Sequence, residues 1–369
     1  MDTQQPSQLR PLNARGERGF VLVLIAVSAF ALVGILGLTL DLGRMYITKS
    51  EAQAFADSAA IAAALELDGT TAGITDANTA VAANLNRWNF STQAFTGTTT
   101  QFATELAGPW VTAPDPATTY RFARVTASAD VRLFFLPAVI TTNHTNVKAQ
   151  AVGAQVAKTS FREALFPFSP YAHSPTGPEF GLVAGQDYTL RWPSNPKLGG
   201  GTNVCPGDRT SGTVALAEAA GGSERGYIED TSADLIRSTI VDDYQSVFRV
   251  VGDLVAMTGG AKQSQLTSLD HRISQDSDSS SLTYAQYVSG GQGNSRRIIA
   301  APINDGGTPA GSNNRIVGIG AFFLKPTGQY GNGGNQAWCA EYIGAWVQGS
   351  RKKGVGDGTN GAYVVRLAE

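Results

Sequence analysis

The stretch FVLVLIAVSAFALVGILGLTL, from Phe20 to Leu40, contains 21 residues without a charge. As an α-helix with a rise of about 1.5 Å per residue, it extends about 30 Å, the thickness of a bilayer's hydrocarbon core. A cleaved secretory signal is the competing interpretation, because Ala29–Ala31 has the form of a cleavage site. Signal sequences have shorter apolar runs of roughly 7–15 residues. The sequence therefore predicts an uncleaved membrane-spanning helix.

Basic residues on both sides of the span predict its orientation. The residues before it are Arg10, Arg15 and Arg18, and those just after it are Arg44 and Lys49. Because basic residues favour the cytoplasmic side, we expect residues 1–19 to be a cytoplasmic lead. Other apolar runs are too short to cross a bilayer. We therefore expect a single-pass protein whose bulk is periplasmic or extracellular.

The helix is expected to continue beyond the span, so that one helix covers residues 20–67. Residues 41–67 contain no proline and are rich in alanine, the strongest helix former. Small apolar residues recur at spacings of three and four and share one face; they are Ala52, Ala56, Ala59, Ala63 and Leu67. This face could receive another helix or could pack on the protein's own outer domain, and the sequence leaves both open.

The rest of the chain predicts a mixed α+β fold with a largely antiparallel sheet. Its 42 glycines and many Thr, Ser and Asn residues are typical of a turn-rich, strand-rich body. Residues 68–160 are expected to form a connecting region with one strand pair, in which residues 68–119 form helical turns and loops. Residues 161–369 are expected to form a β-rich extracytoplasmic domain. Strands are predicted at 120–136, 145–156, 247–251, 298–303, 315–324, 341–348 and 362–367, and helices at 231–242 and 263–273.

Charge and cysteine content exclude two classes of function. Lys plus Arg number 28 and Asp plus Glu number 30, so the chain lacks the basic excess of a nucleic-acid binder. Cys205 and Cys339 are the only cysteines, so no CxxC metal or redox motif exists. Outside the cytoplasm these two could form a disulfide; two unpaired buried thiols are the alternative.

Three segments around the span occur in a characteristic order. Arg15-Gly-Glu-Arg-Gly-Phe20 precedes it, Asp41-Leu-Gly-Arg-Met-Tyr46 follows it, and Gln53-Ala-Phe-Ala-Asp57-Ser-Ala-Ala60 lies in the extended helix. The order is similar to the N-terminal module of TadE/TadG-like proteins of the Flp, or tight-adherence, pilus system. That family has a D-x-G-R-x-Y step and a Q-x-x-A-D-A-A-A-L-A-type helix. A weaker likeness to the family's following strands covers residues 124–157, including Phe134 and Phe135.

The resemblance implies a bacterial inner-membrane protein, and the residues themselves lead us to expect no catalytic, cofactor or metal site. Its partners would be the lipid bilayer, pilin-like proteins and other Tad-system membrane proteins, with no nucleic acid and no small-molecule substrate. The residues implied in the family motif and in helix packing are Asp41, Gly43, Arg44, Tyr46, Gln53, Ala56, Asp57, Ala60 and Ala63. A cut after Gly19 would leave Leu24 where prepilins usually carry Glu, so processing is not predicted.

No motif in the chain points to catalysis. His144, His173 and His271 are not at metal-ligand spacing, and no phosphate loop or nucleophile elbow occurs. Asp276–Ser280 resembles the D-x-S-x-S metal motif of many TadG proteins but has Asp at its third position, so we interpret it as a solvated loop. Trp338, Tyr342 and Trp346 are spaced by four residues, which puts all three on one face of a strand or a helix. They are either core residues or an exposed strip for a partner.

Three hypotheses follow. The leading one is a non-catalytic, membrane-anchored component of Flp/Tad pilus assembly, acting as a minor pilin-like subunit or an assembly factor. The second is a membrane-anchored surface adhesin or binding module. The third is a tethered envelope hydrolase, for which the sequence offers no site.

Overall fold

The computed structural model describes residues 15–138, 141–174, 176–177, 179–219, 224–228, 232–259, 263–306, 313–356 and 361–368. Most of the predicted cytoplasmic lead, including Arg10, lies outside these residues, as does Thr231. The chain divides into two compact units. The first unit contains residues 1–56, 86–98 and 126–150, and the second unit contains residues 57–85, 99–125 and 151–369.

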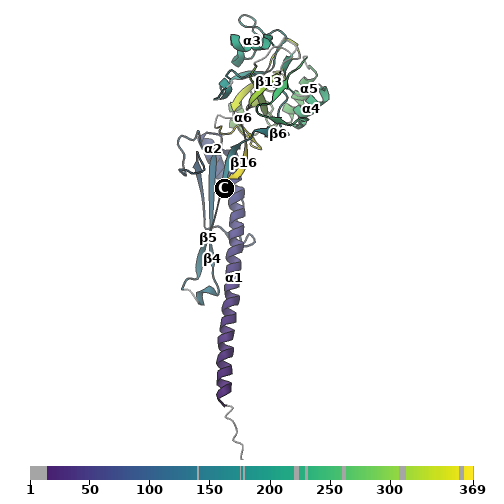
Figure 1. The fold of residues 1–369 in the computed structure, drawn as a ribbon. Helices are drawn as coiled ribbons and strands as arrows, with labels where there is room; N and C mark the ends of the chain where they lie inside the picture. Colours follow the sequence, from purple (N-terminus) through teal and green to yellow (C-terminus); the bar gives the residue numbers. More distant parts are fainter. Residues whose placement is uncertain are drawn as a thin grey trace, which may run out of the picture. The chain divides into compact units, whose positions relative to one another are not determined.

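One helix dominates the N-terminal region. Helix α1 runs without interruption from Arg15 to Glu66, 52 residues in all (Figure 1). Among the described residues it is the one helix long and apolar enough to cross a membrane. Its large apolar side chains from Phe20 to Leu42 are exposed, because no other part of the described chain covers them. The prediction of one helix through the span and beyond it is confirmed.

The body after α1 is mostly antiparallel β-structure, which confirms the α+β fold class. In the second unit, one five-stranded sheet has the order β10-β13-β14-β7, and β12 also pairs with β13. All of these pairs are antiparallel. The strands are β7 Asp187–Arg191, β10 Leu254–Ala256, β12 Ile298–Asn304, β13 Asn313–Leu324 and β14 Trp338–Gly344.

Both faces of this sheet are covered, so most positions of its strands are buried. Neighbouring residues of a strand point to opposite faces, and Phe322 and Phe323 accordingly belong to different core clusters. The Phe322 cluster includes residues of helices α4 (Ala233–Asp242) and α5 (Gln265–Ser274). The Phe323 cluster includes Tyr287 of helix α6, Tyr284–Gly290. The continuous apolar runs of the sequence therefore reflect burial on two sides.

A second sheet has the order β15-β16-β5-β4-β3. In the second unit, β16 pairs antiparallel with residues 152–157 of β5, and β15 pairs parallel with β16. The strands are β3 Gly97–Ala103, β4 Phe122–Arg132, β5 His144–Ala157, β15 Trp346–Gln348 and β16 Ala362–Ala368. The sequence located β4, β5 and β16 within a few residues of their bounds.

Several elements differ from the sequence prediction. Residues 68–119, expected to form helical turns and loops, contain a 13-residue helix α2, Thr71–Ala83, as well as the strand β3. The strand predicted at 247–251 is reduced to β9, Arg249–Val250. The remaining elements are β1 Arg87–Trp88, β2 Gln93–Ala94, β6 Ser160–Phe161, β8 Glu224–Tyr227, β11 Thr258–Gly259, α3 Ser211–Ala219 and the short 3-10 turns Leu136–Ala138, Glu179–Gly181 and Pro206–Asp208.

The evenly spaced aromatic residues are part of the core. Trp338, Tyr342 and Trp346 are all buried. Trp338 and Tyr342 lie in the Phe322 cluster, but Trp346 lies in the Phe323 cluster. The expectation that even spacing puts all three on one face is therefore wrong, because the chain leaves β14 at Gly344 before β15 begins.

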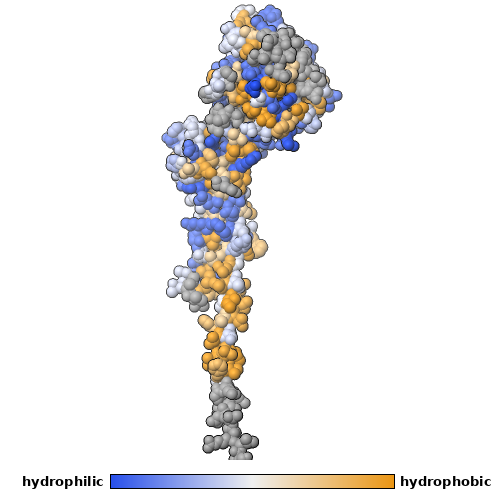
Figure 2. Space-filling view, viewed as in Figure 1, coloured by the Kyte–Doolittle hydropathy of each residue, from blue (hydrophilic) through white to orange (hydrophobic). Residues whose placement is uncertain are grey.

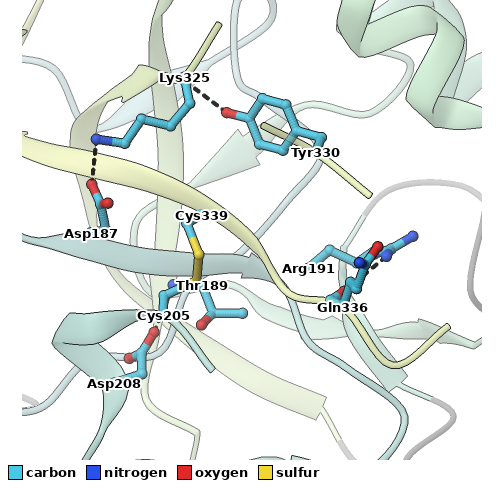
Figure 3. Close-up of a disulfide and its surroundings, with 9 residues drawn as sticks. All are labelled: Asp187, Thr189, Arg191, Cys205, Asp208, Lys325, Tyr330, Gln336 and Cys339. Atoms are coloured by element: carbon cyan, nitrogen blue, oxygen red, sulfur yellow. Dashed lines mark hydrogen bonds and ion pairs between the residues drawn. A yellow bond between two sulfur atoms is a disulfide. The ribbon is translucent and has the colours of Figure 1, made fainter. Parts of the chain in front are cut away.

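Cys205 and Cys339 are joined in a disulfide, which ties the start of a 3-10 turn to strand β14 (Figure 3). The surroundings are densely hydrogen-bonded. Asp208 accepts a 2.6 Å hydrogen bond from the Thr189 backbone N–H. The fully buried Arg191 donates to the Gln336 carbonyl at 2.8 Å and lies over the ring of Trp338. This side of the sheet is thus fixed covalently and by buried polar groups.

Candidate functional site

The site with the most specific geometry is in the first unit, where α1 leaves the apolar span. Asp41 is the first residue after the uncharged stretch and is only 1% exposed. Its carboxylate accepts the backbone N–H groups of three consecutive residues in the β4–β5 connection. The N–O distances are 3.0 Å from Phe134, 2.9 Å from Phe135 and 2.8 Å from Leu136. One carboxylate therefore holds residues 134–136 against the helix, and we call residues 133–137 the turn.

The electrostatics of this contact favour the ionised carboxylate. Burial alone would raise the pKa of Asp41, but the N–H groups of Leu136, Phe134 and Phe135, together with Arg44, bring the pKa below its ordinary value. Hydrogen bonds to a charged acceptor are stronger than neutral ones. The first residue of the D-x-G-R-x-Y step is therefore a fixed anionic clamp for a distant loop.

Two further contacts seat this turn. A Cβ atom added to Gly37 would lie 2.3 Å from Cβ of Phe135, so only glycine leaves room for the turn at that level of the helix. The guanidinium of Arg44 lies 4.5 Å from the centre of the Phe134 ring, and that of Arg132 lies 5.5 Å from it. Cations over an aromatic face are attracted to its electron-rich centre. Asp41 and Arg44 thus contact the same turn.

Beyond Asp41, further contacts tie α1 to the first unit. The Gln53 side chain donates to the Gln150 carbonyl of β5 at 3.1 Å. Glu51 accepts the backbone N–H of Asn89 at 2.7 Å. The ring centres of Phe55 and Phe95 are 5.1 Å apart. This part of the helix is therefore integrated into a folded unit, and Gln53 of the family motif serves that docking.

In the second unit, the small-residue face of α1 is buried in the protein's own body. Ala60 and Ala63 are fully buried. A Cβ atom added to Gly153 of β5 would lie 2.1 Å from the Ala60 carbonyl oxygen, so helix and strand backbones are in direct contact. Of the two alternatives left open by the sequence, packing on the protein's own domain is the one observed.

The C-terminal end of α1 is capped by a buried glutamine that the sequence analysis missed. Gln155 of β5 donates through Nε2 to the Ala64 carbonyl at 2.8 Å and to the Leu67 carbonyl at 2.7 Å. Its Oε1 accepts the Val355 backbone N–H at 2.8 Å. Terminal carbonyls of a helix lack partners within the helix, and Gln155 supplies them. The signal for this role in the sequence was a polar residue, Gln155, among the small apolar residues of a strand.

The opposite face of α1 remains open. In the first unit it presents Gly43, Ile47, Ser50 and Ala54, all exposed and spaced by three or four residues; we call them the exposed stripe. Apart from the adjacent backbone of the helix itself, no atom of the described residues lies within 4 Å of the position that a Cβ on Gly43 would occupy. Tyr46 is exposed next to this stripe, and Asp57 is half-buried. Figure 2 shows hydrophobic residues gathered along the N-terminal part of the same helix.

Comparison with protein families gives a match that covers this helix. Residues 19–66 match the family described as putative Flp pilus-assembly TadE/G-like. The predicted N-terminal TadE/G-like module is therefore confirmed. No curated protein and no solved structure matches the chain. The matched segment contains the apolar span, Asp41, the exposed stripe and the buried alanine face. It therefore includes both the apolar part of α1 and the part that packs on the folded body.

Other polar groups proposed or considered from the sequence serve structural roles. Asp276 was expected in a solvated loop, but it is buried and accepts hydrogen bonds from the Tyr287 hydroxyl and the Arg297 backbone N–H, each at 2.9 Å. Burial would raise the pKa of Asp278, but hydrogen bonds from Ser281 and its neighbour bring the pKa below its ordinary value. In the described part of the chain, no group of three His, Cys, Asp or Glu residues could hold a metal ion.

The three histidines lie apart from one another. His144 pairs with Asp130 at 2.8 Å on the surface, and His173 contacts the buried Asp208 at 2.9 Å. His271 lies 3.1 Å from the Gln275 side-chain nitrogen. Each histidine has its own local partner, so the structure does not bring them into one constellation.

Proposed function

We propose that this chain is a non-catalytic, membrane-anchored component of Flp/Tad pilus assembly, acting as a minor pilin-like subunit or an assembly factor. The supporting observation is the family match over residues 19–66, which coincides with a single helix that is apolar at one end and docked on a folded body at the other. The span would sit in the inner membrane with its N-terminal end in the cytoplasm. The body would lie on the periplasmic or extracellular side.

The exposed stripe is the surface of this helix that fits a pilin-like partner. Small residues allow a second helix to approach closely, and Gly43, Ser50 and Ala54 supply such positions on an open face. The family resemblance also implies helix packing through Ala56 and Ala63. They are fully buried in the protein's own fold, so they support the body rather than an intermolecular contact.

The test replaces Ala54 with Trp in cells that carry this chain as their only copy. Trp would block close approach of a second helix without entering the protein's own core, because Ala54 is exposed. The matched control is Ala94→Trp, which changes an exposed alanine of the first unit outside the helix. We expect fewer pili per cell by electron microscopy for Ala54→Trp only, at equal protein levels in the membrane fraction.

Two results would count against the proposal. Normal piliation in the Ala54→Trp strain would mean that pilus assembly does not need the exposed stripe. Normal piliation in a strain lacking the chain would mean that pilus assembly does not need the protein at all. The non-catalytic part has its own test. Purified full-length protein should not hydrolyse glycosides, esters or peptides, and reproducible turnover of any of them would contradict that part.

A further inference from the structure

The turn clamped by Asp41 lies at the depth of the last apolar turn of the helix. Phe135 packs directly against Gly37, which precedes Leu40 by three residues, or about 4.5 Å along a helix. A bilayer that accommodates the uncharged stretch up to Leu40 therefore reaches the level of Phe135. The turn and the end of the span must share one environment.

The composition of the turn suits that environment. Phe134 is 56% exposed and Phe135 is 42% exposed, and Leu136 and Pro137 follow them half-buried. Four consecutive apolar residues at the tip of a β-connection are unusual where only water surrounds them. Aromatic side chains are enriched at membrane–water interfaces.

The backbone N–H groups of the turn already have the acceptors that an environment of low dielectric constant requires. In hydrocarbon, a backbone N–H without an acceptor is costly, and irregular loops are therefore excluded from lipid unless their polar groups are paired. Asp41 pairs the N–H groups of Phe134, Phe135 and Leu136, and the Asn143 carbonyl accepts the N–H of Leu133 at 2.8 Å. Four successive donors at this tip are thus satisfied within the first unit.

Two arginine side chains beside the turn are positioned to bind the phosphate groups of lipids. Arg44 follows Asp41 by about one helical turn, and Arg132 precedes the turn on β4; both guanidinium groups lie over the Phe134 ring. Arginine side chains beside an apolar segment direct their charge to the headgroup layer and bind phosphate in a bidentate manner. The turn therefore carries an apolar tip with a basic rim.

We propose that residues 133–137 form a second membrane contact, which inserts into the extracytoplasmic leaflet beside α1 and binds phospholipid headgroups through Arg44 and Arg132. The proposal rests on the membrane anchor of the proposed function. It goes beyond that function because the folded unit itself, and not only the span, would contact lipid. The unit would then be held at a fixed height and rotation relative to the bilayer.

The experiment measures depth in the full-length protein in nanodiscs of phosphatidylcholine and phosphatidylglycerol. A nitroxide label is attached to Phe134→Cys or Phe135→Cys, and its accessibility to oxygen is compared with that to a polar nickel complex. Phe30→Cys, 74% exposed within the span, is the reference for lipid. Phe90→Cys is the matched control, because Phe90 is 85% exposed in the same unit but lies beside Glu51. Glu51 is about 15 Å further along the helix than Asp41.

We expect labels at 134 and 135 to favour oxygen, as the label at 30 does, and the label at 90 to favour the nickel complex. Labels at 134 and 135 that behave like the label at 90 would overturn this inference alone and leave the pilus proposal standing. Nickel access at position 30 would overturn the anchor and this inference together. As a second measurement, a benzophenone amino acid at position 134 in piliated cells should yield a phospholipid adduct; crosslinks to another polypeptide alone would overturn the proposal.

Discussion

Replacing Asp41 with Ala tests whether one carboxylate holds the β4–β5 turn on the helix. The substitution removes the acceptor of three backbone N–H groups at 2.8–3.0 Å. A buried donor left without a partner costs about 1–3 kcal/mol. The three contributions do not add fully, because they share one acceptor and the turn can relax. We therefore expect the turn to lose about 3 kcal/mol of local stability.

Hydrogen–deuterium exchange measures this loss directly. Since about 1.4 kcal/mol corresponds to a tenfold change in an equilibrium, amides 134–136 should exchange about 100-fold faster in the Asp41→Ala protein. Asp41→Asn should give a smaller acceleration, because its amide oxygen keeps one acceptor position but its NH2 group faces the remaining N–H.

The control is Asp130→Ala in the same strand pair. Asp130 contacts His144 at 2.8 Å, but both side chains are 47% exposed, and such surface pairs contribute at most about 1 kcal/mol. Exchange at 134–136 should change little in this variant. Equal exchange in Asp41→Ala and wild-type protein would refute the clamp, and equal acceleration in both variants would show that the region opens without regard to Asp41.

Three further predictions concern the second unit. Gly153→Val should prevent stable folding, because its Cβ would meet the Ala60 carbonyl at 2.1 Å; loss of detergent-soluble protein measures this, and normal yield would contradict it. Cys205→Ser with Cys339→Ser should lower the free energy of unfolding by roughly 4–5 kcal/mol, since the disulfide closes a long loop; an unchanged denaturation midpoint would contradict this. The pKa of Asp278 is lowered on folding, so the stabilisation from its carboxylate should be full above the ordinary pKa of 3.8 and be lost as the pH falls below that value. Pepsin cleavage within residues 276–282 should therefore increase as the pH falls, and cleavage that does not increase would argue against this.

Local patterns were sufficient for the elements whose residues carry their own signal. The span and the alanine-rich continuation predicted α1, and Leu269 and Ile273 on one face predicted α5. Helix α2 was predicted only as helical turns among loops, because Gly73 and several threonines lower its helix propensity. Its buried Ile74, Ala77 and Val81 are nevertheless spaced for one helix face, so tertiary packing stabilises what local propensity does not.

The site was only half visible in the sequence. Asp41 and Arg44 stood out as parts of a motif, but their role depends on Phe134, more than ninety residues away in the chain. No local rule connects a carboxylate to the backbone of a distant turn. The direction of the alanine face was similarly undetermined, because a small-residue surface suits its own strand β5 and a foreign helix equally well.

The pairing of β16 with β5 has a consequence for biogenesis. On one of its two edges, residues 152–157 of β5 pair antiparallel with residues 363–368, while the other edge of β5 faces β4. While the intervening stretch is being synthesised, that edge of β5 keeps its backbone donors and acceptors open, and open strand edges recruit other chains. The newly synthesised chain therefore passes through an aggregation-sensitive interval that ends when β16 pairs with β5, and a truncation before residue 363 would make that interval permanent.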